Sequence, residues 1–335
     1  MRRVAPAIVL FFLSPLVAEF LLGDLTVTQL PALVGLAPIY GGGAVLIREV
    51  TRRAGRGWPT MLLLALAYGL VEEGLATQSL FNPDYAGAHL LDHGFVPALG
   101  IAVPWTIFVL ALHVVWSIGA PIAVVEALWP STRPWLRAPG TVAATVLFLV
   151  GVTAVTAISY SDGHFVAPAS RLATVAVLVV LSVAAAFLLP RARTAGATVD
   201  PAPAWSPWLV LVLALALLSA FMGVDLIADR LAWWLVCLFG VAMLTALAWL
   251  VLAGSRRAGW GRPHRLAVAA AALLTYSWHS FTMGSLQHDA SATQLLVSHV
   301  VLAALAVALL AVTALRSARP STVESAARQA EPASR

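Results

Sequence analysis

Two neighbouring glutamates, Glu72 and Glu73, interrupt an apolar stretch of the chain that is long enough to cross a membrane. A charged side chain at the centre of a bilayer costs about 2.5–3.5 kcal/mol on insertion scales. The pair therefore predicts a functional site, because buried carboxylates can transfer protons, activate water or bind a cation. The alternative is a structural pair that hydrogen-bonds Tyr68, Gln78 or another helix.

Three histidines lie in other apolar segments, at depths that overlap with the depth of the glutamates. Carboxylates and imidazoles together form the ligand set of a zinc or similar metal site, and equally the groups of a proton relay. The predicted catalytic residues are Glu72, Glu73, His113 and His279, and the predicted metal ligands are His113, His279 and His299. Equal depth in the membrane does not by itself bring these side chains together.

The loop after the glutamates contains a further pair, His89 and His93, in the sequence His-Leu-Leu-Asp-His. Histidines four residues apart share one face of a helix, as in the zinc motifs HExxH and HxxEH. Asp92 stands where those motifs have glutamate, and no third ligand is evident. The pair is a candidate metal site, but we favour a solvated loop helix on the membrane surface, which begins at Asp84 and ends at Gly94.

The composition predicts the fold class. Of the 335 residues, 61% are hydrophobic and 10% are charged, whereas soluble proteins have about 25% charged residues. Cys237 is the only cysteine, so no disulfide framework or cysteine metal site is expected. Apolar stretches of membrane length recur and predict an all-α, polytopic bundle with ten spans at 4–22, 28–47, 59–78, 102–127, 141–160, 170–189, 207–223, 231–253, 265–285 and 293–315.

The arginines predict the orientation. With the N-terminus in the cytoplasm, 18 of the 20 arginines fall on the inner side, and only Arg171 and Arg230 on the outer side. This follows the positive-inside rule and predicts cytoplasmic termini in the cell (plasma) membrane, with the glutamates in its outer half. The pI near 10.1 is then a signal of topology, so lipid is the expected partner and nucleic acid is not. Because lysine is absent and Ala, Val and Leu abound, we expect a GC-rich bacterial source.

The chain divides into four predicted regions. They are a six-helix membrane region with the Glu-Glu/His site at 1–190, a cytoplasmic linker at 191–206, a four-helix membrane region at 207–315 and a disordered cytoplasmic tail at 316–335. In the second span, the glycines of Pro38–Gly43 either break the helix at a transport gate or, more commonly, allow close helix packing. Arg48 and Glu49 are expected at the membrane interface.

The order of Glu-Glu, His and His on successive apolar segments resembles the CAAX-protease and bacteriocin-processing family of intramembrane proteases. That family carries EExxxR, FxxxH, and a third histidine followed four residues later by Asn or Asp. The matches are Glu72-Glu73 with Thr77 in place of Arg, His113 with Val109 in place of Phe, and His279 with Met283 in place of Asn or Asp. The resemblance covers three short patches and implies a glutamate that activates water, with histidines and the amide assisting or binding metal.

Three functions are compatible with these patterns. The first is an intramembrane (metallo)hydrolase acting on a small molecule or peptide, with Glu73 or Glu72 as general base and His113 and His279 as metal ligands or oxyanion partners. Its cofactor would be a divalent metal such as zinc. The second is a proton-coupled transporter or permease that uses the same acids as proton carriers, and the third is a non-catalytic membrane scaffold. The sequence has no Walker A, Rossmann or haem motif, so nucleotide-driven chemistry is not expected.

Overall fold

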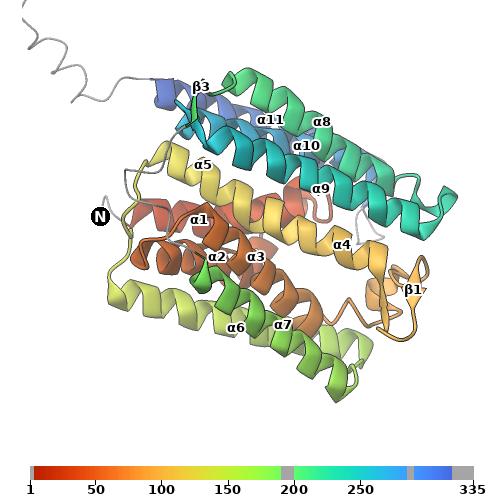
Figure 1. Ribbon diagram of the computed structural model, residues 1–335. Helices are drawn as coiled ribbons and strands as arrows, with labels where there is room; N and C mark the ends of the chain where they lie inside the picture. Colours follow the sequence, from red (N-terminus) through yellow and green to blue (C-terminus); the bar gives the residue numbers. More distant parts are fainter. Residues whose placement is uncertain (1–3, 190–199, 285–289, 319–335) are drawn as a thin grey trace, which may run out of the picture.

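A computed structural model describes residues 4–189, 200–284 and 290–318 (Figure 1). The long helical segments are α1 (Ala5–Pro15) continued by η1 (Leu16–Leu21), α2 (Ala32–Arg53), α3 (Trp58–Val71) continued by η3 (Glu72–Ala76), α4 (Val103–Leu112) continued by η5 (His113–Gly119) and α5 (Ala120–Leu128), α6 (Ala138–Gly163), α7 (Ala169–Leu188), α8 (Pro207–Asp225), α9 (Trp233–Ser255), α10 (Arg262–His279) and α11 (Ala292–Ala318). Single 3₁₀ turns are η2 (Val27–Gln29), η4 (Tyr85–Gly87), η6 (Ala228–Arg230) and η7 (Ser280–Thr282). In the described ranges, β structure is limited to the antiparallel pair β1 (Phe95–Val96) and β2 (Ile101–Ala102) and the parallel pair β3 (Asp200–Pro203) and β4 (Arg257–Ala258).

The ten predicted spans correspond to ten helical segments, so the prediction of an all-α polytopic membrane bundle is confirmed. Eight of the segments are long and apolar enough to cross a membrane, and Ala5–Leu21 is a shorter apolar helix. The second helix is Ala32–Arg53 rather than 28–47. Pro31 is the N-cap residue of this helix, a position at which the N–H that proline lacks would have no partner within the helix. The ninth helix ends at His279, six residues earlier than predicted.

The helices differ in how much of their surface other helices cover. In α4–α5, 67% of the most apolar window is buried inside the protein, against 11% in α6 and in α7. The exposed side chains of α6 and α7 are largely Val, Leu and Ile. Such helices suit a lipid surround, because lipid tails are as apolar as the side chains that face them. The polar residues of the molecule therefore concentrate on the inner helices.

The long helix α4–η5–α5 lies between two groups of helices. Figure 1 shows α8–α11 on one side of it and α1–α3, α6 and α7 on the other. One cluster of buried side chains runs through both groups and includes Phe20, Trp116, Leu218, Leu273 and Leu302. Trp116 stacks on Tyr276 of α10 with ring centroids 4.7 Å apart and donates to the Ala272 carbonyl at 2.8 Å. The predicted division into regions stays a prediction, because the linker at 191–206 and the tail at 316–335 lie largely outside the described residues.

The glycines of α2 serve close packing, and the helix is continuous through Pro38. A methyl group at Gly41 would run into the backbone of Phe11 on α1. At Gly43, a Cβ would lie 2.5 Å from the nearest atom of the Tyr68 ring of α3. Close packing through small residues, the commoner of the two interpretations weighed above, is therefore the one that the helix geometry supports.

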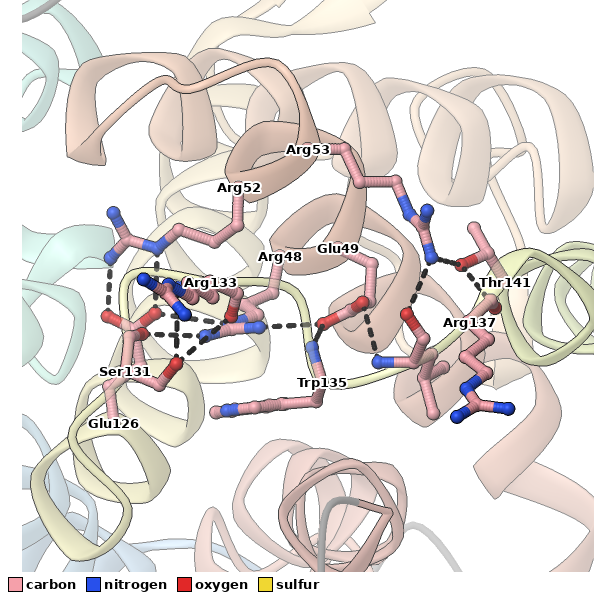
Figure 2. Close-up of polar contacts among 11 residues, drawn as sticks. Arg48, Glu49, Arg52, Arg53, Glu126, Ser131, Arg133, Trp135, Arg137 and Thr141 are labelled. Carbon is pink, nitrogen blue, oxygen red and sulfur yellow. Dashed lines mark hydrogen bonds and ion pairs between the residues drawn. The ribbon is translucent and has the colours of Figure 1, made fainter.

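Arg48 and Glu49 are fully buried among neighbouring helices, close to the end of α2 at Arg53. Their expected position at the membrane interface stays a prediction. Figure 2 shows them with Arg52 and Glu126 in a network at the end of the bundle where α2 and α5 terminate. Arg48 Nη1 is 2.7 Å from Glu49 Oε1, and its Nε is 3.1 Å from Glu126 Oε1. Arg52 reaches both oxygens of Glu126, at 2.9 and 2.6 Å.

Backbone groups complete this network. The N–H groups of Trp135 and Leu136 donate to the two oxygens of Glu49 at 2.9 and 3.0 Å. The guanidinium of Arg48 lies over the Trp135 ring, 3.5 Å from its centroid, and donates to the Ser131 carbonyl at 2.8 Å. Every charge in the network therefore faces an opposite charge or a hydrogen-bonding group, which is the condition for burying an ion pair without a large penalty.

Candidate functional site

Three membrane helices of the described chain contain a π-helical segment, and each of these segments carries an ionisable side chain of one cluster. Glu19 lies in η1, Glu72 and Glu73 lie in η3, and His113 lies in η5. A π turn adds a residue to the helical turn and re-aims the side chains in it, and such turns are frequent at functional sites. The helices thus bend away from regular α geometry where their polar residues meet.

His113 lies between the two glutamates. Its Nε2 is 2.7 Å from Glu73 Oε1, and its Nδ1 is 3.3 Å from Glu72 Oε2. Ser117, one turn further along the helix, places its hydroxyl 3.2 Å from the same Nδ1. The side chains are almost fully enclosed, with exposures of 3% for Glu72, 7% for Glu73 and 4% for His113. Both ring nitrogens are therefore engaged inside the protein.

The second oxygen of Glu73 is held by hydroxyl groups. Thr77 donates to Glu73 Oε2 at 3.2 Å and also to the Glu72 carbonyl at 3.0 Å. Ser79 donates to the same carboxyl oxygen, and the indole N–H of Trp105 lies 3.4 Å from the Ser79 hydroxyl. Thr77, which stands where the protease motif has arginine, thus fixes the orientation of the glutamate without supplying a positive charge.

Two tyrosines and a third acid, none of them a predicted site residue, extend the cluster. The hydroxyl of Tyr40 donates to Glu19. The ring of Tyr40 stacks on His113 at 6.2 Å between centroids, and the ring of Tyr68 meets His113 edge-on at 5.7 Å. Glu19 could have been found by the same signal as Glu72, because it is an acid inside an apolar span. The tyrosines carried no such signal, since aromatic residues are ordinary in membrane helices.

Two buried polar atoms of the cluster make no hydrogen bond among the described residues. They are Glu72 Oε2 and the hydroxyl of Tyr68. Buried polar atoms in proteins are nearly always hydrogen-bonded, so each exception calls for an explanation such as a ligand, a water or a proton. The cluster therefore has spare hydrogen-bonding capacity, whereas the network around Glu126 has its charges paired.

The cluster forms part of the wall of a cavity of about 530 Å³. The cavity reaches from Glu72 and His113 to Tyr85, Asp225 and Asp229, at the end of the bundle opposite the Arg48 network. Helices from both groups line it, including α2, α4, α8, α9 and α10. The cluster is thus accessible from one end of the bundle.

The other two predicted membrane histidines, His279 and His299, do not belong to the cluster. His279 lines the same cavity but has its hydrogen-bonding contacts with Thr282. His299 is buried against Phe281, with ring centroids 5.4 Å apart, and does not line the cavity. Glu72, Glu73 and His113 are thus the predicted residues that the fold brings into contact.

The loop pair does not form the predicted helix. His89 has a left-handed backbone with φ of 50°, and the only helical turn in this segment is η4. The helix prediction for 84–94 was therefore wrong. A left-handed residue cannot continue a right-handed helix, so His89 and His93 do not share a face. His89 lies 3.9 Å from Asp92, and His93 lines the cavity mouth.

Three of the side chains that meet in the cluster carry atoms that can bind a metal ion. Glu72, Glu73 and His113 each offer one ligand atom within 4.8 Å of the others, and within the described ranges they form the only such group of three or more. Carboxylate oxygen and imidazole nitrogen suit zinc. Zinc takes four ligands in most sites, so a bound ion would need a further ligand from the cavity and the release of one His113 contact.

Two groups near the cavity, both outside the membrane spans, have shifted acidities. Burial raises the pKa of Asp24 well above its ordinary value, and the nearby charge of Glu19 raises it further. Burial also raises the pKa of the Tyr85 phenol, and the charges of Glu73 and Glu19 act in the same direction. In both groups the loss of contact with water on burial is the main cause of the raised pKa, and nearby acidic charges add to it.

The fold and the cluster define a class: a multi-pass α-helical membrane protein with a buried Glu–Glu–His cluster in a central cavity. The model of an uncharacterized membrane protein family matches residues 8–326. Because the match covers nearly all of the chain, the protein belongs to this family. No curated protein and no solved structure matches the chain.

Proposed function

We propose that this protein is a proton-coupled transporter of the cell membrane, with Glu72, His113 and Glu73 as its proton-binding centre. The observation that carries the proposal is the position of His113 between two carboxylates, with both ring nitrogens engaged. Under the predicted orientation, this centre lies in the outer half of the membrane and the cavity leads outward.

The distances support a titratable proton in the cluster. A neutral imidazole has one N–H donor and one acceptor lone pair. If the N–H faces Glu73 at 2.7 Å, the lone pair on Nδ1 faces both the Ser117 hydroxyl at 3.2 Å and Glu72 Oε2 at 3.3 Å. The hydroxyl can donate to Nδ1, but a carboxylate oxygen beside the same lone pair is unfavourable, and a proton on Nδ1 or on Glu72 relieves this repulsion. Removal of this proton leaves the cluster more negative in a nearly dry environment, and this difference in charge can drive a change of conformation or of ligand.

An intramembrane metallohydrolase is the second candidate. It is favoured by the group of three ligand atoms, by His279 on the wall of the same cavity, and by the resemblance to the CAAX-protease family. In that function, Glu72 or Glu73 would be the general base, and His113 and His279 would bind the metal or stabilise the oxyanion. The engaged nitrogens of His113 and the neutral Thr77 favour proton binding over this alternative.

Difference infrared spectroscopy between acidic and alkaline buffer tests the proposal without a known substrate. The purified protein is expected to show the carboxyl band of a buried group that titrates, and Glu72→Gln or Glu73→Gln is expected to remove or shift it. Asp162→Asn, a change at an exposed acid outside the cavity, is the matched control and should leave the band unchanged. An unchanged band in both glutamine variants and in the double variant would overturn the proposal.

Metal analysis of the same preparations separates the two candidates. The transporter proposal expects no stoichiometric zinc after purification without chelators. One zinc per chain that is lost in His113→Ala would instead favour the hydrolase.

A further inference from the structure

We infer, on the basis of the transport function proposed above, that the cavity binds an organic cation with an apolar body. The juxtaposition that carries the inference is a cavity wall that combines carboxyl groups and aromatic rings and that receives no arginine from the described chain.

The ionisable side chains on the cavity wall are mostly acidic. Six carboxyl groups line the cavity, and they are Glu19, Asp24, Glu72, Glu73, Asp225 and Asp229. The chain has 20 arginines, yet none of the described ones lines this cavity. The other ionisable groups that face it include His93, His113 and His279. A cleft lined by one sign of charge concentrates ligands of the opposite sign.

The rest of the wall is aromatic and apolar. Tyr40, Tyr85, Trp105, Phe108, Phe221 and Tyr276 contribute rings. A cation over the face of an aromatic ring is attracted by the ring electrons, most strongly when it is desolvated. Such rings are of no use for binding a proton or a simple metal ion through oxygen and nitrogen ligands. The volume of about 530 Å³ lies in the range of small-molecule sites, so the ligand is an organic molecule.

A carboxyl oxygen with spare hydrogen-bonding capacity points to a ligand. Glu72 is 3% exposed and lines the cavity, and its Oε2, which lies 3.3 Å from His113 Nδ1, makes no hydrogen bond among the described residues. At the mouth, Asp225 and Asp229 form no ion pair with any described residue. The acids at the other end of the bundle, Glu49 and Glu126, are paired with arginine. A bound cation would supply the compensating charge that the cavity lacks.

Charge balance then links the ligand to the proton. A cation that enters with one positive charge restores the charge of the cavity if one proton leaves the cluster. Binding of cation and binding of proton are therefore mutually exclusive, and alternation between the two yields exchange of one for the other across the membrane.

Binding of two probes of similar size and opposite charge tests this inference. We expect purified protein to bind tetraphenylphosphonium at one site per chain and to release a proton on binding. Tetraphenylborate should bind at least tenfold more weakly. Glu72→Gln should weaken phosphonium binding tenfold or more, and the double change Asp225→Asn with Asp229→Asn should weaken it several-fold. Asp162→Asn should have no effect.

Equal binding of the two probes, or phosphonium binding that is unchanged in Glu72→Gln and in the double variant, would overturn the inference. Failure of the inference is distinguishable from failure of the proposed function. If the protein shows the titrating carboxyl band but does not bind the phosphonium probe, the proposed proton-binding centre stands and only the inference of a cationic ligand fails. Thermal unfolding of each variant in detergent identifies a change that acts through misfolding.

Discussion

Two buried groups of charged side chains lie at opposite ends of this bundle, and they differ in their partners. Around Arg48, each carboxylate meets arginine. Around His113, two carboxylates share one imidazole and a few hydroxyl groups. A fully partnered network fixes a structure, since removal of any member leaves a charge unpaired. A partly partnered cluster can change its protonation or accept a ligand, which is why we propose a structural role for the first group and a functional role for the second.

The largest expected effect comes from breaking the paired network. Arg48→Met leaves Glu49 without its arginine and takes one of the two arginines from Glu126 in a fully buried place. We expect a loss of about 3–5 kcal/mol of folding free energy, seen as a much lower unfolding temperature and a low yield of folded protein. Arg133→Ala, at an exposed arginine of the same end, should change stability by less than about 0.5 kcal/mol. Similar stability of both variants would contradict a structural role for the network.

Glu73→Gln, in the cluster around His113, is expected to affect function more than stability. The glutamine oxygen can still accept from Thr77 and Ser79, so we expect a change in stability of less than about 1.5 kcal/mol. Proton exchange at the cluster should nevertheless be abolished. Thermal unfolding in detergent checks the expected stability, and the infrared titration checks the expected loss of proton exchange. A Glu73→Gln protein as unstable as Arg48→Met would remove the distinction between the two regions.

The packing that positions the cluster is tested at Gly43. A Cβ there would lie 2.5 Å from the nearest atom of the Tyr68 ring, which contacts His113 edge-on. We expect Gly43→Ala to cost about 1–3 kcal/mol by overpacking and to shift the titration of the cluster. Gly35→Ala in the same helix meets nothing within 4 Å and should be neutral or slightly stabilising. Equal unfolding temperatures for the two alanine variants would argue against this contact.

The smallest effect concerns Asp24 in the loop after η1. Its pKa is raised by burial and by Glu19, so the folded protein retains a proton that the unfolded chain releases above pH of about 4. Stability therefore falls as the pH rises from that value through the folded-state pKa. Asp24→Asn avoids this loss, and its gain in unfolding temperature should be near zero at pH of about 4 and grow with pH. A gain that does not vary with pH would contradict the assigned cause.

The sequence predicted the helices and the central residues of the site, because hydropathy and buried charge are local signals. It could not predict that Glu72, Glu73 and His113 touch while His279 stands apart, since that depends on how the helices pack. It also missed the π turns, which have no sequence signature of their own, and Glu19, which carried the same signal as Glu72. The partners of Arg48 and Glu49 could not be predicted either, because Glu126 and the backbone N–H of Trp135 come from distant parts of the sequence.

Nitrogen NMR of the histidine rings is the most direct test of the central claim that His113 shares a proton with Glu72 and Glu73. The His113 signals can be assigned by their loss in a His113→Gln sample. The account predicts that both ring nitrogens report strong hydrogen bonds, and that their shifts change across the neutral pH range in wild type but not in Glu73→Gln. Signals of a neutral ring with one free nitrogen at every pH, identical in wild type and Glu73→Gln, would contradict it.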